Sequence, residues 1–300
     1  MKLVLGSAQF GMNYGVNNRR GKPPLAECLL MLKKAWDSKI RIFDTAWAYG
    51  DAEDVLGAFI KENGLQRDIR IVSKLRPNLI DEKTPDPVGE VKRQVHISLD
   101  RLGIAQLDGY LLHTPANFYN PSVIEGLRQC RAEGLIHHFG VSIYELEDAI
   151  NVVRSGTVDY IQVPFSVFDQ RVLCSDFFKI AQDNGVVVFG RSVFVQGLIM
   201  MDNVEVPAHL SEAVPYIDRF DQIISRYGLQ RAQAALGFML AHTEIDYAVI
   251  GVDDLEQLDF NIGIAEAEPI PQACIDELIE SYKNVSKAII FPSLWSNRSP

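Results

Sequence analysis

Three ionisable side chains follow short, β-rich apolar runs in the N-terminal part of the chain. The motifs IFDT, IVSK and LLHT place Asp44, Lys74 and His113 at the ends of these runs, and Tyr49 follows shortly after Asp44. In a parallel α/β scaffold the carboxyl ends of neighbouring strands face one mouth. We therefore expect the four side chains to share one active site.

A tyrosine beside a lysine suits proton donation to a carbonyl oxygen. An unperturbed phenol has a pKa of about 10 and is a poor acid at neutral pH. The Lys74 ammonium is expected to lower the pKa of Tyr49, while His113 hydrogen-bonds and orients the same oxygen. Asp44 then balances the charge of Lys74. Because this set lacks a good nucleophile, it favours carbonyl reduction by hydride from a nicotinamide cofactor.

The same residues also admit other interpretations. Asp44 and Lys74 can form a structural ion pair, since buried charges persist only when paired. His113 alone is more often a structural histidine, and Tyr49 alone a loop aromatic. A metal-dependent barrel hydrolase using Asp44 and His113 is disfavoured, because Lys74 would stand where the metal charge belongs. We expect no metal site.

Eight β-rich runs alternate with segments of helical periodicity. The runs are Lys2–Leu5, Ile40–Phe43, Ile69–Ser73, Leu107–Leu112, His138–Val141, Tyr160–Val163, Val186–Phe189 and Tyr247–Ile250. Continuously apolar strands indicate a parallel sheet covered by helices on both faces. Eight such units without a linker predict one domain, residues 1–300, folded as a single (β/α)8 TIM barrel with an extra C-terminal helix and tail. A doubly wound sheet is disfavoured, since no GxGxxG follows the first run.

Helix signals between the runs are clearest in Pro87–Leu102, where apolar residues recur every three or four positions. Asp51 is expected to cap the helix that follows Tyr49, and Gly64 to end it. The segments Glu145–Arg154 and Asp176–Asn184 repeat the scheme. The unit is therefore strand then helix along the chain.

Composition limits the partners and the location. The formal net charge of −10 argues against a nucleic-acid partner, which needs clustered Lys and Arg. The four cysteines are widely spaced and suit reduced thiols. No apolar run approaches the roughly 18 residues of a membrane span, and the N-terminal run is shorter than a signal-peptide core. We expect a cytoplasmic protein that takes a small-molecule substrate and has no nucleic-acid, membrane or metal partner.

Two stretches, FDTAWAYGDAEDVLG and ISLDRLGIAQLDGYLLH, resemble the signature of the aldo/keto reductases. The resemblance runs from LGSAQFG near the start to VIGVDDLEQLDFN near the end. It implies an NAD(P)H-dependent reductase of an aldehyde or ketone on the same barrel. By that resemblance Asp44, Tyr49, Lys74 and His113 are the catalytic tetrad, with Tyr49 as the proton donor.

The resemblance also implies cofactor contacts. Ser142 and Gln162 match residues that hold the nicotinamide carboxamide, and the loop from Ser192 to Gly197 would approach the pyrophosphate. Arg191 stands where many members stack an aromatic ring on the nicotinamide, and a guanidinium plane can also stack. The full cofactor-binding set is Ser142, Gln162, Arg191, Ser192, Gly197, Gly251, Asp253, Gln257 and Asn261.

The stretch Gly251–Asn261 departs from NADPH-preferring members of the family, because it has no basic residue and carries Asp253 and Asp254 side by side. Carboxylates there would repel a 2′-phosphate and can accept from a ribose hydroxyl. The alternative is that both only cap the following helix. The family default is NADPH, yet this stretch predicts that NADH is used at least as readily.

Aromatic residues near the expected mouth are candidates for the substrate pocket, since loops at strand ends carry pocket residues. They are Trp47, Phe118, Tyr119, Phe168, Phe194 and Trp295. Each is also compatible with ordinary packing. A non-catalytic cofactor-binding regulatory protein on the same barrel is the second functional interpretation, and the complete tetrad favours the enzyme.

Overall fold

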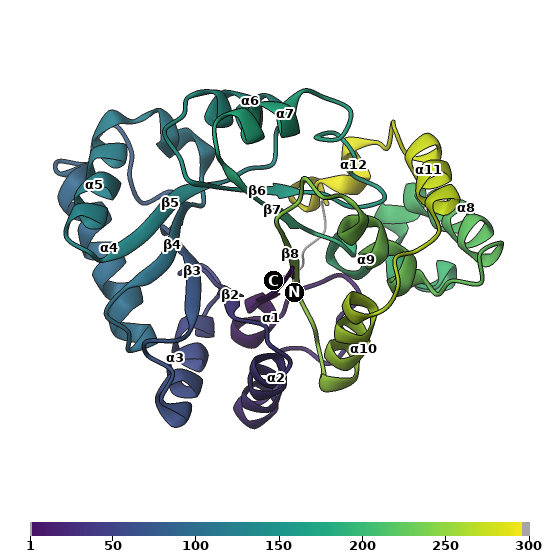
Figure 1. Cartoon of the computed structure of the whole chain (residues 1–300), viewed down its shortest axis with the longest axis horizontal. Helices are drawn as coiled ribbons and strands as arrows, with labels where there is room; N and C mark the ends of the chain where they lie inside the picture. The colour runs from purple at the N-terminus through teal and green to yellow at the C-terminus, as the bar shows by residue number, and fades with distance from the viewer. Residues whose placement is uncertain (1, 296–300) are drawn as a thin grey trace.

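The computed structural model describes residues 2–295, which form a closed barrel of parallel strands (Figure 1). The strands are β1 (Leu3–Gly6), β2 (Ile42–Asp44), β3 (Arg70–Lys74), β4 (Leu107–Leu112), β5 (Ile136–Ser142), β6 (Tyr160–Pro164), β7 (Val187–Arg191) and β8 (Tyr247–Ile250). Each strand pairs with the next, and β8 returns to β1, with Leu3 opposite Ala248. The predicted barrel is confirmed.

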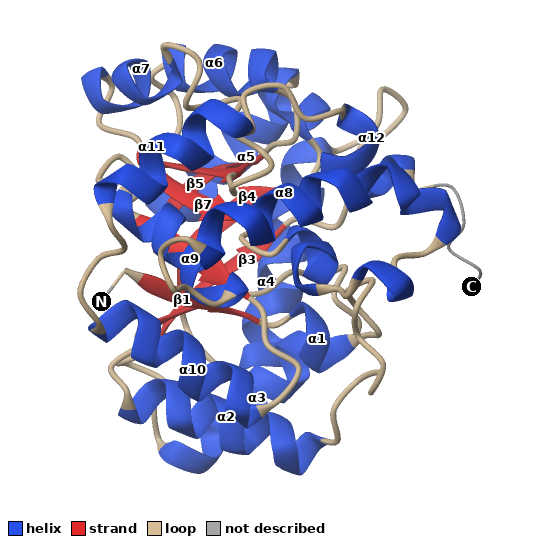
Figure 2. Cartoon of the chain, turned by 90° about the vertical axis from the view of Figure 1, so that its right-hand side faces the viewer, coloured by secondary structure: helices blue, strands red, loops and turns tan. Residues whose placement is uncertain are grey.

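Helices surround the strands on the outside of the barrel (Figure 2). They are α1 (Ala8–Gly11), α2 (Leu25–Asp37), α3 (Ala52–Asn63), α4 (Pro87–Leu102), α5 (Pro121–Ala132), α6 (Leu146–Arg154), α7 (Phe177–Asp183), α8 (Val214–Ser225), α9 (Arg231–Ala241), α10 (Leu255–Glu266), α11 (Gln272–Ser281) and α12 (Lys287–Ile290). The expected addition after the last barrel helix corresponds to α11 and α12. Of the expected tail, residues 296–300 lie outside the described part.

Apolar side chains fill the barrel on both sides of its wall. Successive residues of a strand point to opposite faces, so one set packs inside and a larger set packs between strands and helices. The inner set is Val4, Ile42, Val72, Leu111, Tyr160, Phe189 and Val249. Because the interior is packed, ligands are restricted to the mouth, where the carboxyl ends of the strands meet.

Local signals explain the helix ends, with one correction. Helix α4 has the predicted bounds, and its preceding Asp86 accepts a hydrogen bond from the Gly89 amide at 2.9 Å. Asp51 precedes α3 as expected but makes no side-chain cap, because its carboxylate accepts from Lys22 Nζ at 2.6 Å instead. Gly64 ends α3 with a left-handed backbone at φ 66°, which glycine adopts without strain.

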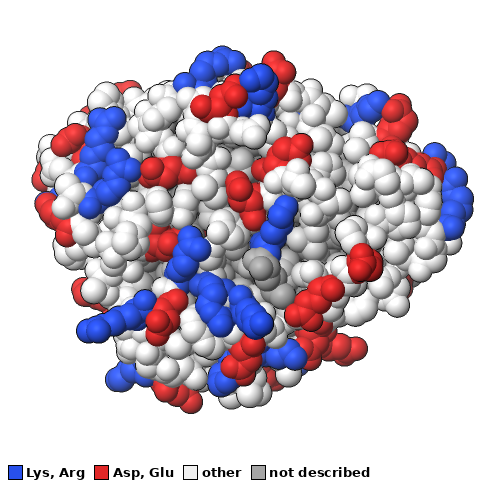
Figure 3. Space-filling view, viewed as in Figure 1, with Lys and Arg blue, Asp and Glu red and all other residues white. Residues whose placement is uncertain are grey.

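Acidic and basic side chains are interspersed on the face seen in Figure 3. Within residues 2–295, no helix combines the length and apolar character needed to cross a membrane. The described residues also contain no group of three or more His, Cys, Asp or Glu placed to hold a metal ion.

Candidate active site

A buried ion pair joins the ends of β2 and β3. Lys74 Nζ donates to Asp44 Oδ1 at 2.8 Å, to Asp44 Oδ2 at 2.7 Å and to the Thr45 carbonyl at 2.9 Å. An ammonium has three N–H donors, so these three contacts use all of them. Burial lowers the pKa of Lys74, and the Asp44 carboxylate opposes that shift. The pair is a fixed structural unit at the base of the mouth.

Tyr49 and His113 lie next to this pair and face the same cavity. Their rings meet edge to face with centroids 5.8 Å apart, and Lys74 Nζ lies 4.9 Å from the centre of the Tyr49 ring. Asp44, Tyr49 and His113 line the cavity, whereas Lys74 is fully buried behind them. Among the described residues the Tyr49 hydroxyl has no hydrogen-bond partner, so it remains available to a ligand.

The expected direction of the Tyr49 pKa is wrong. Burial raises the pKa of Tyr49 well above its ordinary value, the Asp44 charge raises it further, and Arg191 only partly opposes them. Lys74 cannot produce the expected lowering, because its charge is compensated by Asp44 and it has no donor left for the phenol. Tyr49 is therefore protonated at neutral pH, which is the state that a proton donor requires.

His113 is neutral in the folded protein. Burial lowers its pKa to about 3, and the charges of Lys74 and Arg191 act in the same direction. A neutral imidazole carries one N–H donor and one acceptor nitrogen. Its Nδ1 is buried and has no hydrogen-bond partner among the described residues. The ring can thus donate one hydrogen bond to a substrate oxygen without bringing a second charge to the site.

Two buried polar side chains connect this site to the next strands. Gln162 on β6 donates from Nε2 to Asp44 Oδ2 at 2.9 Å and accepts at Oε1 from the Ser142 hydroxyl on β5 at 3.3 Å. Both residues also line the cavity. These hydrogen bonds fix the orientation of the Gln162 amide. Residues expected to hold a carboxamide are therefore part of the same hydrogen-bonded network as Asp44.

Arg191 ends β7 and is held by neutral groups. It donates to the Ile143 carbonyl at 3.0 Å and to the Ser192 hydroxyl at 3.1 Å, and its guanidinium stacks on the Tyr144 ring at 4.1 Å. One face of the guanidinium plane is thus covered by Tyr144. Its buried Nε has no partner among the described residues.

A cavity of about 480 Å³ opens at the carboxyl ends of the strands and extends from Tyr49 to α10. All nine residues expected to bind a cofactor line it: Ser142, Gln162, Arg191, Ser192, Gly197, Gly251, Asp253, Gln257 and Asn261. An added Cβ at Gly251 would lie 2.5 Å from Gln9 Nε2, so a side chain there would displace the Gln9 amide from the cavity wall. The size, the polar lining and the unpartnered atoms fit a nicotinamide dinucleotide.

Asp253 and Asp254 have different environments, although they are neighbours in the sequence. Asp254 caps α10 by accepting a hydrogen bond from the Gln257 amide at 2.9 Å. For Asp254, the alternative expectation of a helix cap is therefore confirmed. Asp253 makes no cap. Its Oδ1 is buried without a hydrogen-bond partner among the described residues, and burial raises its pKa. Asp253 Oδ1 is thus a free acceptor in the cavity wall, while a hydrogen bond from Gln257 to the carboxylate partly opposes the rise in the Asp253 pKa.

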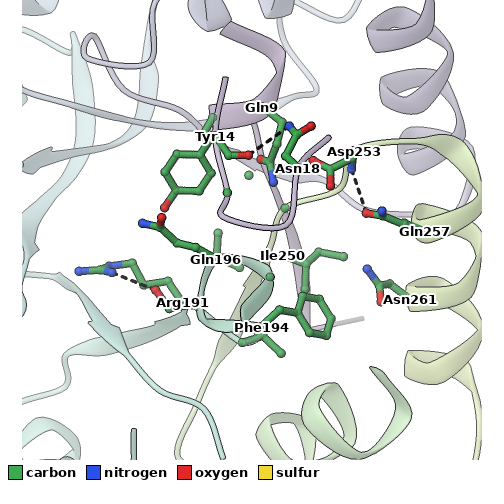
Figure 4. A pocket seen from close by; sticks show the side chains of 18 of the residues that line it. Gln9, Tyr14, Asn18, Arg191, Phe194, Gln196, Ile250, Asp253, Gln257 and Asn261 are labelled. Atoms are coloured by element: carbon green, nitrogen blue, oxygen red, sulfur yellow. Dashed lines mark hydrogen bonds between the residues drawn. The ribbon is translucent and has the colours of Figure 1, made fainter. Parts of the chain in front are cut away.

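The loop after β7 and the segment after β1 close the cavity together. The Val16 amide donates to the Gln196 carbonyl at 2.9 Å, and the Tyr14 hydroxyl points toward the Gln196 side chain (Figure 4). Val195 and Gln196 have left-handed backbone angles, φ 49° and 55°, which cost energy for residues with a side chain and concentrate at functional sites. This contact between two strand-end loops holds the wall in shape.

The loop after β1 also contributes to the cavity wall, which was not predicted from its sequence. Tyr14, Gly15, Asn17 and Asn18 all line the cavity. A smaller hollow beside it is lined by Arg19 and Arg20 as well as by Asp253. A signal was present, because the segment after any barrel strand reaches the same mouth and this one is rich in Gly and Asn.

The expected substrate-facing aromatics need correction. Phe194 lines the cavity, but none of Trp47, Phe118, Tyr119, Phe168 and Trp295 does so in the described part of the chain. Phe168 is 1% exposed and stacks on Tyr282 within an aromatic cluster of the core, so it cannot contact a ligand. Tyr119 is largely exposed and donates to Asp148 at 3.0 Å, and Trp295 Nε1 donates to the Ala288 carbonyl at 3.0 Å.

Trp47 and Phe118 also have partners within the protein. Arg76 stacks over the Trp47 ring at 4.1 Å, and Phe118 meets the Tyr119 ring at 5.4 Å. Stacking of this kind stabilises the loops that carry them. Their expected contact with a substrate stays a prediction.

Comparisons with known proteins agree with this geometry. The sequence model of the aldo/keto reductase family matches residues 2–283. Pyridoxal 4-dehydrogenase from Microbacterium luteolum is 25% identical over 310 residues, covering 87% of this chain and 88% of that protein. NADH-specific methylglyoxal reductase from Escherichia coli is 23% identical over 269 residues, covering 78% and 81%.

Solved structures give the same fold. An aldo-keto reductase from Bacillus halodurans, solved in its holo form, has a TM-score of 0.74 at 20% identity and covers 98% of this chain and 95% of that one. The family match extends over nearly the whole chain, including every strand end that carries the site. This chain therefore belongs to the aldo/keto reductase family and is an NAD(P)H-dependent oxidoreductase that reduces carbonyl compounds.

Proposed function

We propose that Tyr49 is the proton donor in the reduction of an aldehyde or ketone, with Asp44, Lys74 and His113 completing the catalytic set. The observation that carries this proposal is the position of Tyr49, which lines the cavity beside His113 and whose hydroxyl has no hydrogen-bond partner in the described residues. Burial favours the protonated phenol and the neutral imidazole. A phenol in this state has its proton ready for a carbonyl oxygen.

In this mechanism the side chains act on the carbonyl oxygen. His113 donates an N–H to the oxygen and orients it, and Tyr49 gives up its proton as negative charge develops there. An alkoxide is a far stronger base than a phenolate, so the proton moves to it even though the Tyr49 pKa is raised. Bound NADH or NADPH supplies the hydride to the carbonyl carbon. The charge of Arg191 then helps to stabilise the Tyr49 phenolate until solvent reprotonates it.

The cofactor would be held along the cavity from β5 to α10. Ser142, Gln162 and Arg191 would contact the nicotinamide end, which brings it to the side of the cavity that carries Tyr49. The loop from Ser192 to Gly197 would take the pyrophosphate, and Gln257 and Asn261 the adenosine end. Support comes from the shared cavity and from the ordered polar contacts of Gln162 and Arg191.

NADH is proposed as a cofactor at least as good as NADPH. The free Asp253 oxygen would accept from a ribose hydroxyl and repel a 2′-phosphate. The two basic side chains nearby are already paired, Arg19 with Glu205 and Arg20 with Glu27 at 3.2 Å. The name of the similar Escherichia coli reductase, NADH-specific, points the same way. Dissociation constants for both cofactors at low salt test this, and a large preference for NADPH would refute it.

The substrate is proposed to be a small carbonyl compound, as pyridoxal and methylglyoxal are in the names of two similar proteins. Steady-state oxidation of the reduced cofactor by purified protein should be measured against a panel of aldehydes and ketones. We expect turnover with at least one member. Tight cofactor binding without turnover across the panel would instead favour the non-catalytic regulatory role.

A cytoplasmic location is proposed as well. The four cysteines are unpaired, and three of them are buried. Unpaired thiols are typical of a reducing compartment. Fractionation of cells that produce the protein would test this, and recovery outside the cytoplasm would contradict it.

A further inference from the structure

A buried carboxylate lies directly behind the catalytic pair. Glu53, in the first turn of α3, is fully buried. Its Oε1 accepts from the Ser73 hydroxyl at 2.6 Å, and its Oε2 accepts from Arg101 Nη1 at 3.1 Å. Ser73 precedes Lys74 on β3, and successive strand residues point to opposite faces. Lys74 thus reaches inward to Asp44, while Ser73 ties the same strand outward to Glu53.

Arg101, at the end of α4, extends this connection to the turn that carries Tyr49. Its Nη2 donates to the carbonyl of Gly50 at 2.7 Å, and also to Asp54 at 2.6 Å. One guanidinium therefore holds the peptide next to Tyr49 and, through Glu53, the strand that presents Lys74.

The turn at Tyr49 is packed so closely that it has few alternative positions. Gly50 has a left-handed backbone, φ 61°, and an added Cβ would lie 2.2 Å from the Gly11 carbonyl oxygen. On the other side, an added Cβ at Gly57 of α3 would lie 2.2 Å from the Arg101 carbonyl oxygen. Helices α3 and α4 are thus in backbone contact at Arg101, which gives its side chain a fixed origin.

We propose that Arg101 and Glu53 are positioning residues of the reaction, which set the place of Tyr49 relative to the Asp44–Lys74 pair. Neither is among the residues that line the cavity, so both act through Gly50 and Ser73 rather than on the substrate. The proposal rests on the proposed role of Tyr49 as the acid. A displacement of about 1 Å in a reacting group lowers the rate by about 100-fold, so a small shift of the turn should be measurable.

The first test is Arg101→Met compared with Arg101→Lys. We expect Arg101→Met to lower kcat by about 10- to 100-fold, with KM and cofactor affinity changed by less than about threefold. Lysine keeps a positive charge near Glu53 but cannot hold Glu53 and the Gly50 carbonyl together as a guanidinium does. Arg101→Lys should therefore recover only part of kcat. The solvent isotope effect on kcat should rise in both variants, because proton delivery becomes slower than the other steps.

Asp54→Asn is the matched control. It weakens the ion pair on the exposed side of the same guanidinium and leaves the Glu53 and Gly50 contacts in place. We expect kcat to stay within about twofold of the wild type. An equal loss of kcat in Asp54→Asn and Arg101→Met would overturn the proposal, as would a variant Arg101→Met that lowers Tm and leaves kcat unchanged.

A crystal structure of Arg101→Met gives a readout that does not depend on activity. We expect the Tyr49 hydroxyl to move by about 1 Å while the Asp44–Lys74 pair keeps its place. An unmoved Tyr49 would overturn the positioning role even if kcat falls. Failure of the wild-type protein to reduce any carbonyl compound would overturn the proposed function, and the displacement of Tyr49 would still decide the positioning role.

Discussion

Strand β3 carries a basic residue at each end, and each base pairs with an aspartate close to a tyrosine. At the amino end, Arg70 Nε donates to Asp108 Oδ1 at 2.8 Å. The Tyr160 hydroxyl donates to Asp108 Oδ2 at 3.1 Å, and Arg70 Nη2 donates to that hydroxyl at 3.4 Å. Arg70, Asp108 and Tyr160 are therefore all hydrogen-bonded to one another, and the Tyr160 hydroxyl both donates and accepts within this group.

At the carboxyl end the same three kinds of side chain are arranged differently. Lys74 and Asp44 satisfy one another and the Thr45 carbonyl, so the Tyr49 hydroxyl is excluded from the pair and faces the cavity. The two ends show that residue types alone do not make a reactive site. The end that we propose to be reactive is the one where the ion pair is complete without the phenol.

The largest expected effect separates the two tyrosines. Tyr49→Phe should lower kcat by at least about 100-fold, because general acid catalysis contributes about 10²–10⁴-fold, while cofactor affinity stays nearly intact. Tyr160→Phe should leave kcat close to the wild type and lower the free energy of unfolding by about 1 kcal/mol, the net worth of a hydrogen bond. Steady-state kinetics and urea unfolding measure both. Wild-type kcat in Tyr49→Phe would mean that the acid is misassigned.

The two bases should differ in their effect on stability. Lys74→Met leaves the buried Asp44 charge without its partner, so we expect the free energy of unfolding to fall by about 3–5 kcal/mol. The Arg70 side chain is 40% exposed, and Arg70→Met should cost only about 1 kcal/mol. Urea unfolding measures both variants. An equal fall in the free energy of unfolding would contradict the expected difference between the two ion pairs.

The pH dependence of stability should reveal the neutral state of His113. The unfolded chain binds a proton at this residue below about 6.5, whereas the folded chain does so only near a pKa of about 3. Acid therefore favours the unfolded chain between pH 6.5 and pH 3. The free energy of unfolding that neutral His113 contributes is lost as the pH falls through this range. His113→Gln should reduce the loss of Tm between pH 6.5 and pH 3. A His113 ring signal that titrates near 6.5 by NMR would contradict this.

The smallest expected effect concerns the neighbouring residues Asp253 and Asp254. Asp254 accepts a hydrogen bond from the Gln257 amide, whereas Asp253 Oδ1 has no hydrogen-bond partner among the described residues. Asp253→Asn should weaken NADH binding by about tenfold, the loss of one charged hydrogen bond, and should narrow any difference from NADPH. Asp254→Asn should change cofactor affinity by less than about twofold and lower the free energy of unfolding by up to about 1 kcal/mol through the helix cap. Fluorescence titration with both cofactors measures the pair. Identical behaviour of the two variants would show that Asp253 has no special role.

Positions in the sequence predicted much of the site, and contacts between distant segments decided the rest. The barrel followed from the apolar runs. The proximity of Asp44, Tyr49, Lys74 and His113 followed from the ends of β2, β3 and β4 together with the signature stretches, and their catalytic roles stay a prediction. The direction of the Tyr49 pKa did not follow, because it depends on how completely Asp44 neutralises Lys74. The sequence does not show whether an aromatic side chain in a loop is buried. The prediction that Phe168 lines the substrate pocket is wrong for that reason.

The adenosine end was only partly predictable for the same reason. The stretch Gly251–Asn261 contains no basic residue, yet Arg20 reaches it from the segment after β1 and lies 3.5 Å from Asp254. The separate roles of Asp253 and Asp254 also needed the helix start of α10 to be located. Side-chain pairing across loops is a property of the folded chain, which a linear motif does not contain.

The central claim is that this site passes hydride to a carbonyl carbon while Tyr49 protonates the oxygen. Single-turnover reduction with a cofactor deuterated at both positions of nicotinamide C4 tests it most directly. We predict deuterium on the carbinol carbon of the product from the wild-type protein, and almost no product from Tyr49→Phe loaded with the same cofactor. Protium from solvent at that carbon, or deuterated product from Tyr49→Phe at the wild-type rate, would contradict the account.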